Sequence, residues 1–401
     1  MGLIRYECSK VFRNRVIWIT FGIFILINLY NLWITAPYTG KGHPQYHYNR
    51  GREAIYRKVE GLITNENIRL VLDGWDATYA EITSSMSEPE KLSDQYYTKT
   101  ANGDWSVYDE LKQEMQRQYE YNESIEQIRE YAQQNLEYLD GGDASFESRR
   151  NHRILEIYEA RHIQSFYDLT GFSVYLQYDF SSLLLIMLTL LGIVPFFSSE
   201  WECGMAPLLS SSRLGQGHTH RNKQVATLLY ITLIAAFFFM MDFSYFFFSG
   251  KLSGGNNPLY SMNAFRYTPL TCTIWQYLFL SWVMKLLALY VIGFIFLLLS
   301  SLFKETYPAF VLGVGLIVVF MVNGNKIAFI NPITLLTFNE FSSRLSMVDL
   351  FGYPVLAVLW LPVFMAGLLL TLSLLIFLVN RNRWQFSFTC LWKQVIQSLR
   401  W

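Results

Sequence analysis

Six long apolar stretches constrain this 401-residue chain more than any other feature. A helix needs about 20 predominantly apolar residues to cross the hydrocarbon core of a bilayer. The stretches that meet or approach this length are 16–36, 180–198, 224–249, 275–301, 308–323 and 354–380. We therefore expect an all-α polytopic membrane protein with six transmembrane helices, in which 308–323 is the shortest span.

Charged residues are scarce and unevenly distributed. They make up only 16% of the chain, against about 25% in soluble domains. The formal net charge is zero, but residues 37–179 carry −10 and the remaining residues carry +10. No basic face dominates, so nucleic acid is not an expected partner.

The distribution of Lys and Arg predicts the orientation, because short cytoplasmic loops are enriched in both. With the N-terminus inside, the inner segments carry 12 such residues, and the short outer loops 250–274 and 324–353 together carry four. We expect a multi-pass protein of the cell membrane. Both termini, including the tail 381–401, would then be cytoplasmic.

Residues 37–179, between the first two spans, form the expected extracellular domain. This segment is large enough to fold on its own. Residues 105–140 are rich in Glu, Gln, Lys and Tyr and lack Pro and Gly, which favours a long helix. Further helices are expected over 145–169 and 53–72, so the domain is predicted to be mainly α-helical.

The loop 199–223 between the second and third spans has an ordered pattern of side chains. Acidic residues open it, a Leu-Leu pair follows, and basic residues close it. Such a linker suits a short helix that docks in a groove of a cytoplasmic partner. An ordinary cytosolic loop, with Lys and Arg set by topology alone, is the alternative.

This loop resembles that of ABC-2 type transporter permeases, Firmicute members in particular. The similarity rests on Glu202-x-Gly204-Met205-x-x-Leu208-Leu209-Ser-Ser, followed by a Lys that leads into the next span. Residues 1–15 look like the interfacial elbow helix of that family. The six spans also match, as does the loop 324–353, where members place short re-entrant helices. The domain 37–179 is not covered by the resemblance.

The resemblance implies a permease subunit that is not itself an enzyme. The chain lacks the nucleotide-binding pattern G-x-x-x-x-G-K-[ST]. ATP and Mg²⁺ would therefore be bound by a separate ATPase subunit docked at 199–223, and this chain would bind no cofactor. No metal site is expected either. The implied contacts are Glu200, Glu202, Gly204, Leu208, Leu209 and Arg213 in the loop, flanked by Tyr6, Glu7 and Lys10 of the elbow.

A second permease half, identical or different, would complete the transport pathway. Export is the expected direction, and amphipathic peptides or lipid-like molecules suit an apolar pathway. Resistance to antimicrobial peptides is one role that fits. The alternative is a membrane sensor or scaffold, whose acidic extracellular domain binds a cationic peptide.

Two ionisable residues lie within the predicted spans. Asp242 is 19 positions after Lys223, and Lys285 is 19 positions before Lys304. At 1.5 Å per residue, both lie roughly 28 Å from the cytoplasmic face. An intramembrane Asp242–Lys285 charge pair is therefore geometrically allowed. It would act as a latch or substrate contact, or serve only to hold the structure together.

Overall fold

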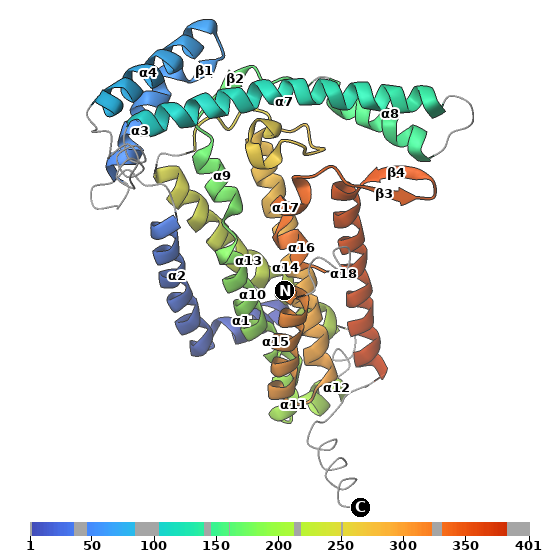
Figure 1. Cartoon of the computed structure of the whole chain (residues 1–401). Coiled ribbons are helices and arrows are strands. Elements are labelled where there is room, and N and C mark those ends of the chain that lie inside the picture. Colours follow the sequence, from blue (N-terminus) through green and yellow to red (C-terminus); the bar gives the residue numbers. More distant parts are fainter. Residues whose placement is uncertain are drawn as a thin grey trace, which may run out of the picture.

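The computed structural model is mostly helical and contains a bundle of apolar helices with further helices lying across one end (Figure 1). It describes residues 2–35, 46–84, 104–139, 146–159, 161–211, 218–249, 252–322 and 331–382. The predicted tail 381–401 lies almost entirely outside these residues.

The bundle contains the six predicted apolar segments as helices. They are α2 (Arg15–Thr35), α10 (Phe180–Ile193), α13 (His218–Phe248), α14 (Ile274–Leu302), α15 (Thr306–Val322) and α18 (Ala357–Asn382). Within the described residues, five helical stretches are long and apolar enough to cross a membrane, and α15 is a shorter apolar helix. The chain is therefore a membrane-embedded helical protein.

Helix α14 lies at the centre of the bundle. It packs against α10, α13, α15 and α18, and a capping box formed by Thr273 and Gln276 fixes its first turn. By contrast, α2 and α18 expose rows of large apolar side chains, as expected for helices that face lipid. These include Val16, Ile19, Leu26 and Tyr30 on α2, and Leu359, Val363, Leu370 and Leu374 on α18.

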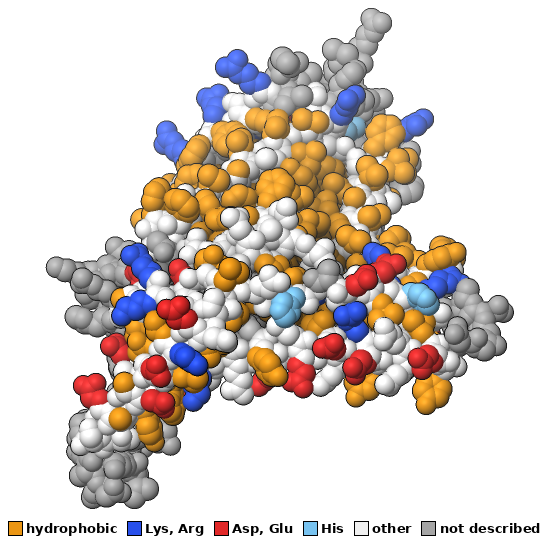
Figure 2. Space-filling model, turned by 90° about the horizontal axis from the view of Figure 1, so that it is seen from above, with side chains coloured by type: hydrophobic (Ala, Val, Ile, Leu, Met, Phe, Trp, Pro, Cys, Tyr) orange, Lys and Arg blue, Asp and Glu red, His pale blue; other side chains and the backbone are white. Residues whose placement is uncertain are grey.

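Residues of the predicted extracellular domain form a separate layer, here called the insert domain. It consists of α3 (Tyr46–Val59), α4 (Asn65–Ser84), α7 (Asp104–Leu139) and α8 (Phe146–Tyr158), with β1 (Gly61–Leu62) paired antiparallel to β2 (Ser165–Phe166). Its helix α7 crosses the end of the bundle (Figure 1), which we call the insert end. Figure 2 shows Asp and Glu side chains gathered over the insert domain, whereas hydrophobic side chains cover the bundle.

The expected helices of this domain are confirmed in part. The prediction over 105–140 matches α7 to within one residue at each end. The helix predicted over 145–169 ends at Tyr158, because residues 165–166 pair with β1 instead. The helix predicted over 53–72 is interrupted, since Gly61 adopts a φ of 126° and opens a strand between α3 and α4.

Hydrogen bonds to backbone carbonyls fasten the insert domain to the bundle. Arg161 Nη1 donates to Thr268 O at 2.7 Å, and Arg149 Nη1 donates to Gly352 O at 2.9 Å. In the reverse direction, Arg266 Nη2 donates to Arg117 O at 3.1 Å. The segment between α13 and α14, which contains η1 (Leu259–Ser261) and η2 (Asn263–Phe265), provides two of these contacts.

The predicted outer loop 324–353 contains two short helices and a strand. The helices are α16 (Ile333–Leu336) and α17 (Phe338–Ser342). Strands β3 (Met347–Leu350) and β4 (Tyr353–Leu356) then form an antiparallel hairpin, so the last span starts at Ala357 and not at 354. Phe351 and Gly352 both have positive φ, as a type I′ turn requires.

Candidate functional site

Helix α11 (Pro195–Glu202) starts the predicted coupling loop and ends in a defined turn. Gly204 N donates to Trp201 O at 3.1 Å, and Met205 N donates to Glu200 O at 2.9 Å. These two bonds form a Schellman motif, in which the residue after the C-cap has a positive φ. Gly204 has a φ of 69°. The Gly-Met pair of the sequence pattern therefore turns the chain from α11 into α12 (Ala206–Ser211).

A cluster of four ionised side chains, three of them buried, holds α11 in place. Glu200 on α11 accepts from Lys10 Nζ of α1 (Gly2–Phe12) and lies as close to Lys223 Nζ of α13, both at 2.6 Å. Lys10 also pairs with Glu7 at 3.2 Å. Lys223 is completely buried, and the residue exposures of Glu7 and Glu200 are 3% and 9%. We call these four residues the inner ion cluster.

The inner ion cluster is balanced in charge, with two carboxylates and two ammonium groups. Burial alone would lower the pKa of Lys10, but the hydrogen bond and the charge of Glu200 raise it above its ordinary value. The ammonium of Lys223 also lies 4.1 Å from the centroid of the Phe197 ring. The cluster thus joins α1, α11 and α13 without leaving a buried charge uncompensated.

Polar contacts also join α11 to the next two helices. Ser300 Oγ on α14 accepts from Phe197 N at 2.9 Å and thereby satisfies a free N–H in the first turn of α11. At the other end of α11, Glu202 Oε1 accepts from Thr306 N at 2.6 Å, at the start of α15. A carboxylate at this position also favours the helix dipole of α15. Helix α11 is therefore bonded to α1, α13, α14 and α15.

Beyond the Gly204 turn, the chain presents apolar side chains to the surface. Leu208 is 66% exposed and Met205 is 47% exposed, and Leu209 is half-buried. Helices α11 and α12 lie at the end of the bundle opposite α7 (Figure 1), which we call the loop end. An exposed apolar segment next to a rigidly held helix is a suitable docking element for another protein.

The structure thus gives the predicted loop residues different positions. Glu200 lies inside the inner ion cluster, Glu202 bonds to the backbone of α15, Gly204 forms the turn, Leu208 and Leu209 lie on α12, and Arg213 falls outside the described residues.

The predicted elbow forms as α1. Glu7 and Lys10 belong to the inner ion cluster, whereas the Tyr6 ring is 57% exposed and lies 4.9 Å below the Lys10 ammonium. The sequence pattern included Lys223 as the Lys that leads into the third span, but its ion pair with Glu200 was not predicted.

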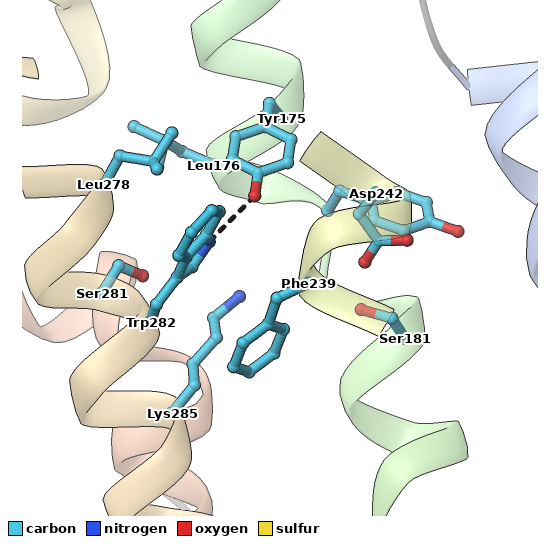
Figure 3. A pocket seen from close by; sticks show the side chains of 10 residues that line it. Tyr175, Leu176, Ser181, Phe239, Asp242, Leu278, Ser281, Trp282 and Lys285 are labelled. Carbon is cyan, nitrogen blue, oxygen red and sulfur yellow. Dashed lines mark hydrogen bonds between the residues drawn. The ribbon is translucent and has the colours of Figure 1, made fainter. Parts of the chain in front are cut away.

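Asp242 and Lys285 have different partners from the one predicted. Lys285 Nζ lies 2.6 Å from Asp179 Oδ1. Asp242 Oδ1 accepts from Asn28 Nδ2 at 2.6 Å, and Asn28 Oδ1 accepts from the Tyr178 hydroxyl at 2.7 Å. The predicted pair rested on the similar depth of Asp242 and Lys285 in the membrane. Asn28 on α2 and residues 178–179, just before α10, also lie at this position and provide the observed partners. The two side chains do line one pocket (Figure 3).

No protein-family model matches this sequence, and no curated protein is significantly similar to it. Within the described residues, no group of three or more His, Cys, Asp or Glu side chains is arranged to hold a metal ion.

Proposed function

We propose that this chain is the membrane-spanning permease subunit of an ABC transporter of the ABC-2 type. A separate ATPase subunit would bind ATP and Mg²⁺ and dock at the loop end. In this proposal α15 also crosses the membrane, as the fifth of six spans in chain order. The loop end and both termini are cytoplasmic, and the insert domain is extracellular. The 17 residues of α15 rise about 26 Å, a small deficit that local thinning of the bilayer accommodates.

The observation that carries the proposal is the attachment of α11 to four other helices beside an exposed α12. A partner that binds Leu208 and Met205 contacts a segment connected to α11 through the Gly204 turn. Any displacement of α11 acts on α1 and α13 through the inner ion cluster and on α14 and α15 through Ser300 and Glu202. Such an arrangement transmits motion of a nucleotide-driven partner to the bundle.

The transported substrate is proposed to be an amphipathic peptide or a lipid-like molecule, exported from the cell. The apolar faces of α2 and α18 suit contact with lipid or with a second permease half. Protection against antimicrobial peptides is a role that such an exporter would serve.

Association with an ATPase tests the proposal directly. The chain is co-expressed with a candidate ABC ATPase subunit, and the complex is isolated through a tag on the permease. Leu208→Asp is expected to weaken association about 10- to 100-fold, because burying a leucine contributes about 1.5–3 kcal/mol. Leu62→Asp is the matched control, since Leu62 on the insert domain is also 66% exposed. Full association of Leu208→Asp would refute docking at α12.

A second candidate function, sensing of a cationic peptide, is favoured by the exposed face of α7. Tyr131 and Tyr138 are 67% and 90% exposed, and Glu130 and Glu137 lie beside them on the same helix. Acidic and aromatic side chains together suit a cationic amphipathic peptide. Peptide-stimulated ATP hydrolysis by the reconstituted complex supports transport, whereas peptide binding without any associated ATPase supports sensing.

A further inference from the structure

A small pocket is lined by residues of α9 (Thr170–Gln177), α10, α13 and α14 and of the link between α9 and α10. Helix α9 lies near the insert end of the bundle (Figure 1), and Figure 3 shows the pocket from close by. Its volume is about 20 Å³, enough for one water molecule or a bare alkali ion. Oxygen atoms from hydroxyl and carboxylate groups face it alongside aromatic rings. The polar residues that line it are Tyr175, Tyr178, Ser181, Asp242, Ser281 and Lys285.

The charges at this pocket do not balance. Asp242 is only 4% exposed, and the groups hydrogen-bonded to it, the Asn28 amide and the Ser181 hydroxyl, are neutral. The charge of Lys285 also acts on Asp242, but without an ion pair between them. The ammonium of Lys285 is held by Asp179. With all three ionisable groups charged, two carboxylates face one ammonium, and the surplus negative charge lies on the more deeply buried Asp242.

Two other clusters of charged side chains compensate their buried charges. The inner ion cluster, in which Glu7, Glu200 and Lys223 are buried, contains as many ammonium groups as carboxylates. In the insert domain, Arg52 pairs with both Asp168 and Glu110, but the Glu110 side chain is 37% exposed, so water stabilises its charge. Asp242 has neither a cation of its own nor comparable access to water. An isolated carboxylate in a low-dielectric interior must acquire a positive charge.

We propose that the pocket binds one monovalent cation at Asp242, either a proton or a sodium ion. The Asn28 amide donates to Oδ1, and the Ser181 hydroxyl lies beside the same carboxylate (Figure 3). Ser181 supplies a hard oxygen ligand for sodium or an acceptor for the proton. The titratable groups that face Asp242 from the neighbouring elements are Tyr175, Tyr178, Asp179 and Lys285. The site does not depend on an ATPase partner.

Infrared spectroscopy of the full-length protein at neutral pH tests this proposal. If the cation is a proton, a band of a buried protonated carboxyl group is present with or without sodium. If it is sodium, the band appears only when sodium is removed, and one radioactive sodium ion binds per chain. Asp242→Asn abolishes either signal, whereas Asp76→Asn on the exposed face of α4 preserves it. Absence of both signals from the unmodified protein overturns the proposal.

A second variant covers the case in which Asp242→Asn does not fold. Asp179→Asn removes the other carboxylate and frees Lys285 to neutralise Asp242. The charge count then predicts loss of the carboxyl band and of sodium binding. If Asp179→Asn retains either signal in full, the charge-balance argument is wrong. Ser181→Ala separates the two cations further, because loss of an oxygen ligand weakens sodium binding but leaves a protonated Asp242 in place.

Discussion

Replacing Glu200 by Gln is the most direct test of the inner ion cluster, because this carboxylate lies between two ammonium groups. The substitution keeps the size of the side chain and removes its charge. Lys10 retains Glu7 as a partner, and its side chain is 31% exposed. Lys223 is fully buried, and among the described residues no carboxylate other than Glu200 lies within ion-pair distance of it.

The expected magnitude follows from the Glu200–Lys223 pair. At 2.6 Å and an effective dielectric constant of about 20, the Coulomb attraction is on the order of 6 kcal/mol before desolvation. Removing one partner of a buried pair typically costs about 3–5 kcal/mol. We therefore expect Glu200→Gln to lower the free energy of unfolding by about 3–5 kcal/mol and to weaken association with the ATPase.

Unfolding in denaturing detergent, followed by tryptophan fluorescence, measures this effect. Glu137→Gln, at an exposed position of α7, serves as the control and should change stability by less than about 0.5 kcal/mol. The double variant Glu200→Gln/Lys223→Met also removes the unpaired ammonium of Lys223 and should recover much of the lost free energy of unfolding. If the double variant is no more stable than Glu200→Gln alone, buried-charge compensation is not what holds α11.

Three further predictions concern the backbone and the insert domain. Gly204→Ala should lower the free energy of unfolding by about 1 kcal/mol, because Gly204 has a φ of 69°, which disfavours a side chain. A Cβ would meet no other atom at Gly204 or at Gly22 on α2, so Gly22→Ala is the matched control and should not be destabilising. Thermal unfolding compares the two variants. Phe351 has a φ of 55° and is fully exposed, so Phe351→Gly should raise stability by about 1 kcal/mol in the same assay; an unchanged or lower melting temperature would contradict backbone strain at this turn. Burial raises the pKa of Tyr121 to about 12, so its unfolded form ionises first and stability is lost as pH rises from about 10 toward 12. The free energy of unfolding, measured across that pH range, should fall less steeply in Tyr121→Phe than in the unmodified protein. Tyr138→Phe, at a 90% exposed position, should match the unmodified protein.

Elements governed by local sequence were predictable. Residues 105–140 contain no helix breaker, and α7 forms over almost the same range. The apolar spans were found because a bilayer requires long apolar segments. Residues 159–169 also lack Pro and Gly, yet α8 ends at Tyr158, because a strand from a distant part of the chain pairs with 165–166. That choice depends on long-range pairing, which local composition does not encode.

The position of the candidate site in the chain was predictable, but its ion pairs were not. The acid-Gly-Met pattern located the loop, and the positive φ of Gly204 explains one of its residues. The partners of Glu200 come from residues 190 positions earlier and 23 positions later in the chain. Asp179, the partner of Lys285, was not predicted for the same reason. Asp179 precedes α10 and lies outside the apolar stretch, so the comparison of charged residues within the spans did not include it.

The length of α7 has a mechanical consequence. Its 36 residues extend about 54 Å, from α3 and α4 to α8, which packs against the β4 strand that continues directly into α18. Arg161 and Arg266 tie the same layer to the segment between α13 and α14. The insert domain therefore connects the insert ends of α14 and α18. If the bundle rearranges during the proposed transport cycle, we expect the largest displacements at the opposite end, where α11 and α12 lie.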